Sequence, residues 1–362
     1  MKRIALVLHG LQAYTGTEVM FANLSHYINT EQIHLTFFIA IDPGEPQFLE
    51  NEVKQSGADV IHLHDLDHFR FLLWPWTLYR AFKQYGPFNA VHANMNLQNG
   101  VVLASARLAG IPMRICHAHT SAHNRDHTSL LRRIYRSLMR SLIHRYANVR
   151  LACAEDAGLY YYGNDSFTIL DNGIELSRFD YCNSEKRRER TRFIAVGRFA
   201  AEKNPFFLLD VFEAVYRKNK NAHLTWVGTG PLQKEIKDQV HRKGLDTAVT
   251  FLGQRKDIPE LMREADIFLF PSRAEALGLA LVEAQAAGLT CYASDRVPKK
   301  ADCGLCRFLS LDLTAEEWAE TILHEDTFLV QDRKKLERYD IRHMADRLTA
   351  LYLTDTEERT SV

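Results

Sequence analysis

The sequence lacks an apolar run long enough to cross a membrane or to serve as a secretory signal. Its most apolar segments, such as LTFFIAI at 35–41, have the length of a strand, and the opening MKRIALVLHG runs directly into a turn. An excess of charge is missing too, because 45 Lys and Arg balance 45 Asp and Glu. This balance argues against a general attraction to nucleic acid. We therefore expect a cytoplasmic protein without nucleic-acid partners.

Cysteine is scarce as well. Only six cysteines occur in 362 residues, and Cys116, Cys153 and Cys291 stand in apolar, strand-like surroundings, which is typical of buried, reduced thiols. Cys303 and Cys306 form one C-x-x-C pair, but no second pair follows at zinc spacing. Two loop cysteines are the better interpretation of this pair, and we expect no metal there.

What the sequence does contain is an almost continuous alternation of apolar, strand-like runs with helical patterns. At this length two domains are favoured over one. Alternation of this kind predicts parallel sheets covered on both faces, and hence two doubly wound α/β domains facing each other across a cleft. The strand-like runs lie at 3–8, 34–40, 59–63, 89–93, 113–119, 192–198, 222–228, 249–253 and 266–272. The helical segments between them lie at 18–27, 69–84, 97–109, 205–218, 232–243, 257–265 and 278–287.

The boundary between the two domains is indicated by a change in composition. Residues 181–192 are polar and charged and have no apolar periodicity, which is typical of a linker. Ligands of doubly wound sheets bind at the carboxyl ends of the strands, so the turns that follow strands are where functional residues are expected.

The segment 271–288 carries the strongest functional pattern. Glu275 and Glu283 are separated by seven residues, with Gly278 between them. Gly278 can open a helix and allow a ligand to approach the backbone, and the free amides from Leu279 onward would face an anion such as a diphosphate. Glu283 can accept hydrogen bonds from ribose hydroxyls, and Glu275 from sugar hydroxyls. Solvated charges at a helix start are the alternative, but the glycine between the glutamates favours binding.

A second pattern, VGRFAAEKNP at 196–205, brings two cations to the end of a strand. Arg198 and Lys203 flank the loop that leads into a helix begun by proline. The planar guanidinium of Arg198 and the compact charge of the Lys203 ammonium group suit a diphosphate. That both are ordinary exposed surface cations is an equally weighted alternative. The G-x-G at 228–230 is too short for a dinucleotide fingerprint, which argues against an NAD-dependent dehydrogenase.

In the N-terminal half, one glycine and two histidines stand out. Gly16 lies in the turn TGTEV, which suits a backbone close to a sugar or phosphate, or is simply a turn from strand to helix. His117 and His119 end an apolar strand and share one of its faces. No third ligand at useful spacing completes a metal site. We expect His119 to form hydrogen bonds in the cleft, and His117 either to be structural or to support the residues that contact the ligand.

Residues 129–147 form a basic amphipathic helix. An apolar stripe with arginines on the other sides admits two interpretations. A core-facing helix with a solvated basic side is favoured for the fold, and contact with anionic lipid headgroups is kept as a functional alternative. The stripe consists of Leu130, Ile134, Leu138, Leu142 and Tyr146, and the arginines are Arg132, Arg133, Arg136 and Arg140.

The order of its segments makes the chain resemble the retaining glycosyltransferases of the GT-B fold in family 4, particularly those of bacterial exopolysaccharide, capsule and O-antigen (lipopolysaccharide) assembly. These segments are, in order, TGTEV, RICHAHTS, LACAEDAGLYYYG, LDNGIELSRF, VGRFAAEKNP, WVGTGPL, FLGQRKDI and FPSRAEALGLALVEAQAAG. The resemblance runs over nearly the whole chain, and its specific parts are the Glu275–Glu283 pair and the 196–205 loop. It implies an acceptor-binding, Rossmann-like domain at 1–180, completed by a C-terminal crossing helix within 333–362. It also implies a Rossmann-like domain at 181–332 that binds a nucleoside diphosphate-sugar donor.

The resemblance further implies how the donor diphosphate is held. Arg198 and Lys203 match the diphosphate clamp, Gly278 and Leu279 match the backbone segment over the phosphates, and Gly16 matches a glycine turn beside them. Such enzymes typically need no metal, because a helix N-terminus and two cations neutralise the leaving diphosphate. No cofactor is therefore expected.

The remaining candidates are implied to contact the sugars. Glu283 matches the ribose ligand, Glu275 the residue that contacts the donor sugar, and His119 the histidine that faces the transferring sugar. Ala276 stands where the family usually has glycine, which bears on the choice of donor sugar. Glu275 and His119 are thus the candidate catalytic residues.

The prediction is therefore transfer of a sugar, with retention, from a UDP- or GDP-sugar to a hydroxyl of a glycan or lipid-linked saccharide, in peripheral contact with the inner membrane face. A nucleotide-sugar epimerase of the same fold and a non-catalytic partner subunit of a glycosyltransferase are the alternatives. The intact clamp argues against the partner subunit, because a subunit without activity has no reason to keep it.

Overall fold

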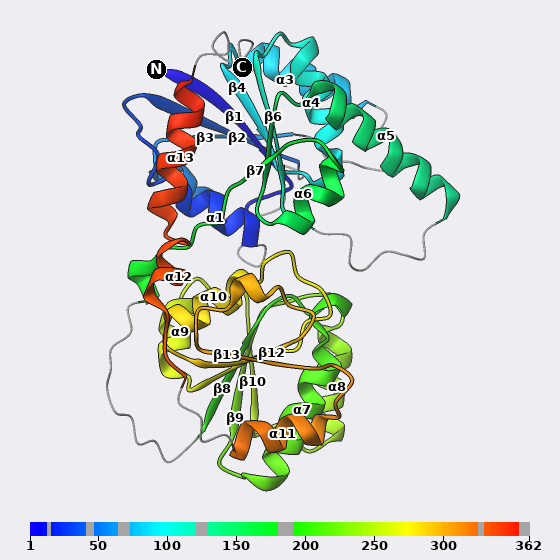
Figure 1. Ribbon diagram of the computed structural model, residues 1–362, viewed down its shortest axis with the longest axis vertical. Helices are drawn as coiled ribbons and strands as arrows, with labels where there is room; N and C mark the ends of the chain where they lie inside the picture. The colour runs from blue at the N-terminus through cyan, green and yellow to red at the C-terminus, as the bar shows by residue number, and fades with distance from the viewer. Residues whose placement is uncertain are drawn as a thin grey trace. The chain divides into compact units, whose positions relative to one another are not determined.

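The computed structural model describes residues 1–12, 16–40, 47–63, 73–120, 129–179, 191–324 and 329–354. The chain forms two compact units, one made of residues 1–173 and 341–362 and the other of residues 174–340. Each unit contains one parallel sheet with helices on both faces (Figure 1). The prediction of two doubly wound α/β domains is thereby confirmed.

The N-terminal unit is built on a seven-stranded sheet in the order β3-β2-β1-β4-β5-β6-β7. Its central strands are apolar throughout, because helices cover them on both sides; in β1 the residues from Ile4 to Leu8 are all buried. The strands are β1 (Lys2–Leu8), β2 (Ile33–Ile39), β3 (Asp59–His62), β4 (Ala90–Ala93), β5 (Met113–Ala118), β6 (Val149–Ala152) and β7 (Thr168–Ile169). Its helices are α1 (Gly16–Leu24), α2 (Glu50–Gln55), α3 (Trp74–Tyr85), α4 (Asn99–Leu108), α5 (Leu130–Tyr146), α6 (Glu155–Tyr162) and α13 (Ile341–Leu353).

The last helix of the chain belongs to the core of this first unit. Met344, Leu348 and Tyr352 of α13 share one apolar cluster with Met20 and Phe21 of α1. Figure 1 shows α13 in red beside α1 in blue. The crossing helix expected within 333–362 is divided in two, because α12 (Arg333–Glu337) belongs to the second unit and the chain enters the first unit at Ile341.

The C-terminal unit is built on a six-stranded parallel sheet in the order β10-β9-β8-β11-β12-β13. Separate apolar clusters cover its two faces. The strands are β8 (Arg192–Val196), β9 (His223–Val227), β10 (Val249–Gly253), β11 (Ile267–Phe270), β12 (Thr290–Ser294) and β13 (Cys306–Leu309). The helices are α7 (Pro205–Lys218), α8 (Gln233–Arg242), α9 (Ile258–Glu264), α10 (Leu279–Ala286), α11 (Ala315–His324) and α12, with 3-10 turns η3 (Leu176–Phe179), η4 (Ala201–Lys203) and η5 (Lys299–Ala301).

Helix α5 differs from the interpretation favoured for the fold. Leu130, Ile134 and Leu138 of the predicted core-facing stripe are 69%, 56% and 54% exposed, whereas the buried residues of α5 are Met139 and Ile143. That interpretation is wrong for the first half of the helix. In the second half, Met139 and Leu142 lie against Gly100 of α4, and Arg140 lies over the ring of Tyr160 of α6. Most of the predicted linker at 181–192, namely residues 181–190, lies outside the described residues, as do residues 69–72 of the expected helix at 69–84.

The packing of α4 on α5 depends on one glycine. A Cβ at Gly100 would lie 2.5 Å from the carbonyl oxygen of Met139 and 3.0 Å from Cβ of Leu142. We expect Gly100→Ala to destabilise the N-terminal unit by about 1–3 kcal/mol, because the two helices must move apart. Helix propensity alone predicts the opposite sign, a gain of about 1 kcal/mol. Urea unfolding followed by the fluorescence of Trp74 and Trp76 measures the change, and a more stable variant would contradict the packing described.

Candidate functional site

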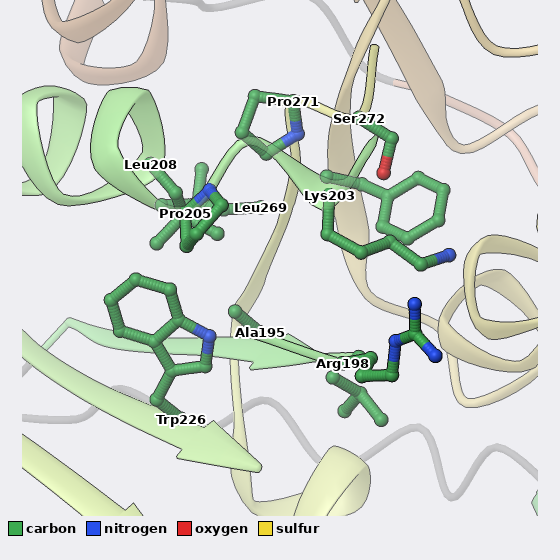
Figure 2. A pocket seen from close by; sticks show the side chains of 12 residues that line it. Ala195, Arg198, Lys203, Pro205, Leu208, Trp226, Leu269, Pro271 and Ser272 are labelled. Carbon is green, nitrogen blue, oxygen red and sulfur yellow. The ribbon is translucent and has the colours of Figure 1, made fainter. Parts of the chain in front are cut away.

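A pocket lies at the carboxyl ends of β8 and β11 in the C-terminal unit (Figure 2). Residues of the β8–α7 loop form one side and residues that follow β11 form the other. Most of the side chains that line it are apolar, and two are cationic. The lining includes Ala195, Arg198, Lys203, Pro205, Leu208, Trp226, Leu269, Phe270, Pro271 and Ser272.

The two cations predicted from the sequence lie together at this pocket. Figure 2 shows the side chains of Arg198 and Lys203 pointing to the same side. Lys203 Nζ lies 2.5 Å from Oε1 of Glu275, and 5.3 Å from the ring centroid of Phe270. Arg198 Nη2 lies 2.9 Å from Oε1 of Glu202. Each cation is therefore held in place by a carboxylate, and the pair offers two positive groups to an anion that can replace those contacts.

The loop that carries Glu275 leads into α10 through a glycine with left-handed backbone. Gly278 has φ 88° and ψ 59°, and an added Cβ would lie 3.1 Å from the Phe270 ring. Another residue would be strained at this φ, so glycine fits the position for a local reason. Leu279 is the first residue of α10, where the backbone amides of a helix are free to bind an anion.

Glu283 lies one turn further along α10 and is partly exposed. Desolvation by burial raises the pKa of its carboxyl group to about 7, and the positive charge of Arg178 opposes this rise. Arg178 belongs to η3, which packs against α10 and α9, and it donates a hydrogen bond to the carbonyl of Lys256 (3.1 Å). The sequence interpretation assigned no role to Arg178, although it stands in the segment LDNGIELSRF that supports the resemblance.

The predicted site residues of the N-terminal unit lie at the ends of β5 and β1. His119 follows β5, and its Nε2 lies 3.0 Å from Oδ1 of Asn94, which follows β4. Burial lowers the pKa of His119 to about 3, and the side chain of Asn172 opposes the shift. The imidazole is therefore neutral. Asn94 was missed, although its position directly after an apolar strand could have indicated it.

Gly16 is the first residue of α1, and residues 13–15 of the predicted glycine turn lie outside the described residues. Two residues into this helix, Glu18 is buried and accepts a hydrogen bond from the amide of Gln12 (2.6 Å). Desolvation raises the pKa of Glu18 to about 7, opposed by hydrogen bonds from the backbone of Gln12 and Gly10. No sequence pattern separates this buried carboxylate from an ordinary acidic residue at a helix start.

Within the C-terminal unit the fold thus brings Arg198, Lys203, Glu275, Gly278, Leu279 and Glu283 to the loops after β8 and β11 and to α10. Gly16 and His119 lie in the N-terminal unit. Among the described residues, no group of three or more His, Cys, Asp or Glu side chains could hold a metal ion. The five described cysteines are free and buried. Cys306 begins β13 rather than lying in a loop.

Comparison with known proteins adds independent information. A family model described as Glycosyltransferase Family 4 matches residues 14–178, and one described as Glycosyl transferases group 1 matches residues 180–302. The chain is 33% identical over 342 residues to the putative glycosyltransferase EpsF of Bacillus subtilis, covering 89% of this chain and 87% of EpsF. It is 24% identical over 356 residues to the capsular polysaccharide biosynthesis glycosyltransferase CapH of Staphylococcus aureus, covering 94% and 96%.

A solved structure is similar over the whole length. HepE of Anabaena, determined in complex with UDP and glucose, has a TM-score of 0.76 to this chain at 17% identity, with 100% of both chains covered. At this identity the similarity concerns the fold. The described residues contain no helix long and apolar enough to cross a membrane.

Proposed function

The chain belongs to the family 4 glycosyltransferases, and from this membership we propose that it moves a sugar, with retention, from a nucleoside diphosphate to a hydroxyl of a cell-surface glycan precursor. The observation that carries the proposal is the placement of Lys203 and Arg198, with Glu275, beside the start of α10. The chain is a glycosyltransferase, as the sequence predicted. No observation favours an epimerase or a non-catalytic partner subunit.

The donor diphosphate lies against the two cations and the first amides of α10. Its oxygens replace the carboxylates of Glu202 and Glu275 as partners of Arg198 and Lys203, which restores the hydrogen bonds that these cations lose. The N-terminus of α10 adds partial positive charge, which attracts the diphosphate. These groups supply the positive charge that the leaving diphosphate requires, so the proposal includes no metal and no cofactor.

The two glutamates of this region take different parts of the donor. Released from Lys203, the Glu275 carboxylate is free to accept hydrogen bonds from hydroxyls of the donor sugar. Glu283, one turn into α10, accepts hydrogen bonds from the ribose hydroxyls. A uridine nucleotide is the simplest choice, because HepE, which has the same fold, binds UDP; a GDP-sugar is the alternative.

Retention follows from a reaction on one face of the donor sugar. The bond between the anomeric carbon and the diphosphate oxygen breaks, and a bond to the acceptor oxygen forms on the same side. The proton of the acceptor hydroxyl passes to the leaving phosphate oxygen, so no protein nucleophile is needed. His119 orients the transferring sugar as a neutral hydrogen-bonding group, and Gly16 allows the backbone at the start of α1 to approach the donor phosphates.

The acceptor is proposed to be a glycan or lipid-linked saccharide at the inner face of the cell membrane, reached by a cytoplasmic enzyme. The first half of α5 supports this proposal, because its exposed apolar and basic side chains are the combination that binds anionic lipid surfaces. Leu131 is 78% exposed beside the exposed Arg132 and Arg133. CapH, a relative over nearly the whole chain, is named for capsular polysaccharide biosynthesis.

We expect one of UDP, GDP and ADP to bind in the absence of metal. Lys203→Ala and Glu283→Ala should each weaken that binding at least tenfold, about 1.4 kcal/mol, in calorimetric titration. Lys243→Ala is the matched control, because Lys243 Nζ also pairs with carboxylates of the same unit, Asp210 (3.1 Å) and Glu213 (2.5 Å), and does not line the pocket. Failure of all three nucleotides to bind would overturn the donor site.

The same titration should depend on pH through Glu283. Its folded pKa of about 7 lies above the ordinary value, so the carboxylate becomes protonated as the pH falls through 7 and no longer accepts two ribose hydroxyls. Wild-type affinity is expected to fall by up to about tenfold per pH unit below 7, and Glu283→Gln to show a flatter dependence. Protonation of the nucleotide itself affects both proteins alike. Equal slopes would exclude Glu283 as the titrating ligand.

The exposed first half of α5 leads to a separate prediction, that the protein binds anionic vesicles, which flotation measures. The protein should float with vesicles of phosphatidylglycerol and phosphatidylcholine but not with phosphatidylcholine alone. Loss of two charges in Arg132→Gln/Arg133→Gln should weaken binding about 30-fold, at about 1 kcal/mol for each arginine. Arg217→Gln/Lys218→Gln on α7 removes the same charge from the other unit and serves as the control. Equal loss in both double variants would point to total charge rather than α5.

A further inference from the structure

Beneath His119, a chain of buried side chains connects two strands of the N-terminal sheet to the C-terminal helix. Tyr352 Oη on α13 lies 2.6 Å from Nδ1 of His92 on β4. Nε2 of His92 lies 3.1 Å from Nδ1 of His117 on β5. The ring centroid of His117 is in turn 4.0 Å from that of His119. None of these contacts is used by the proposed reaction, although they end at a residue that is.

All the members of this chain are uncharged. Burial lowers the pKa of His92 to about 3, holds that of His117 well below its ordinary value, and raises that of Tyr352. Phe21 of α1 packs edge-on against the imidazoles, and the nearby carboxylate of Glu18 on the same helix accepts a hydrogen bond from a backbone amide instead. A neutral imidazole has one N–H donor and one bare nitrogen acceptor, so each ring in the chain has a direction.

The hydroxyl of Tyr352 sets that direction. If the Tyr352 hydroxyl accepted a hydrogen bond from His92, the hydroxyl proton could not bond to His92. Leaving a buried donor without its partner costs about 1–3 kcal/mol. Tyr352 therefore donates to Nδ1 of His92. His92 then carries its proton on Nε2 and donates to Nδ1 of His117, which leaves the proton of His117 on Nε2. This nitrogen is buried and has no hydrogen-bond partner among the described residues.

A second branch from His92 fixes the tautomer of His119. The backbone carbonyl of His92 accepts a hydrogen bond from Nδ2 of Asn94 (3.1 Å), so the oxygen of that amide faces His119. His119 must then donate from Nε2 to Asn94 Oδ1, and its Nδ1 is bare. That Nδ1 is also buried, and Asn172 is the second amide side chain that interacts with this imidazole.

The two branches give neighbouring rings that complement each other. His117 has an unpartnered N–H among the described residues and His119 has a bare nitrogen, and a reversed order of hydrogen bonds would place two bare nitrogens on the adjoining rings. We propose that Tyr352 and His92 are positioning residues, which support His119 for glycosyl transfer by fixing the tautomer of His117, whose ring packs against that of His119. The proposal rests on the function proposed for His119, but the tautomers themselves can be measured without any substrate.

The test is long-range ¹H–¹⁵N NMR on the full chain labelled at histidine, with signals assigned by single substitutions. In the wild type, His92, His117 and His119 should each carry one proton, on Nε2. In Tyr352→Phe the hydrogen bond between His92 and His117 can run in either direction, and both directions leave the same number of buried nitrogens without a partner. His92 and His117 should therefore become mixtures of both tautomers. In Asn94→Ala only His119 should lose its single tautomer. The two variants thus affect different rings.

Tyr162→Phe is the matched control. Tyr162 is fully buried in the same unit, and its hydroxyl bonds to the carbonyls of Cys116 and Leu151 (both 2.7 Å) rather than to an imidazole. It should leave all three tautomers unchanged. A proton on Nδ1 of His92 in the wild type, or unchanged tautomers in Tyr352→Phe, would overturn the proposal.

Activity provides the second measurement once nucleotide titration has identified the donor. Tyr352→Phe should lower kcat about tenfold, the effect of one lost orienting hydrogen bond, with nucleotide affinity unchanged. If the tautomers change as expected while kcat stays at the wild-type value, the cluster does not position His119 for transfer. If the wild type binds no nucleotide, that result would instead contradict the donor site.

Discussion

The parallel pairing of every strand is the constraint on which the rest of this molecule depends. In a parallel sheet the turns after all strands meet at one edge, so residues far apart in the sequence become neighbours. Lys203 and Glu275 are separated by 72 positions and still form an ion pair, because one follows β8 and the other follows the adjacent β11. In the other sheet, Asn94 and His119 meet for the same reason at the ends of β4 and β5.

The two units use this edge in chemically different ways. At the C-terminal unit the groups are charged and held ready by temporary partners, since Arg198 and Lys203 are paired with carboxylates that an anion can replace. At the N-terminal unit burial keeps the imidazoles neutral, so what they offer is the direction of their hydrogen bonds. A diphosphate needs charge and a sugar hydroxyl needs oriented donors and acceptors, and the division suits a reaction that brings both together.

The sequence predicted the two doubly wound domains, but what it predicted of the candidate site was local. The loop 196–205 and the Glu275–Glu283 pair are short patterns tied to strand ends, and they lie where expected within their unit. The orientation of α5 was not predictable, because an apolar stripe does not reveal how far its neighbours reach; α4 meets the helix near Met139, beyond the exposed first half. Tyr352 and His92 are 260 positions apart, and no spacing in the sequence connects them.

The return of α13 to the first unit explains why that unit cannot be understood from its own stretch of sequence. The helix supplies apolar side chains to the N-terminal core and the hydroxyl that sets the direction of the buried histidine chain. Core packing alone would be satisfied by phenylalanine at position 352, because an apolar ring of similar size fills the same space. A hydroxyl is required only if the direction of the buried hydrogen bonds matters. Its position 2.6 Å from Nδ1 of His92 is therefore the feature of α13 on which the proposed support of His119 depends.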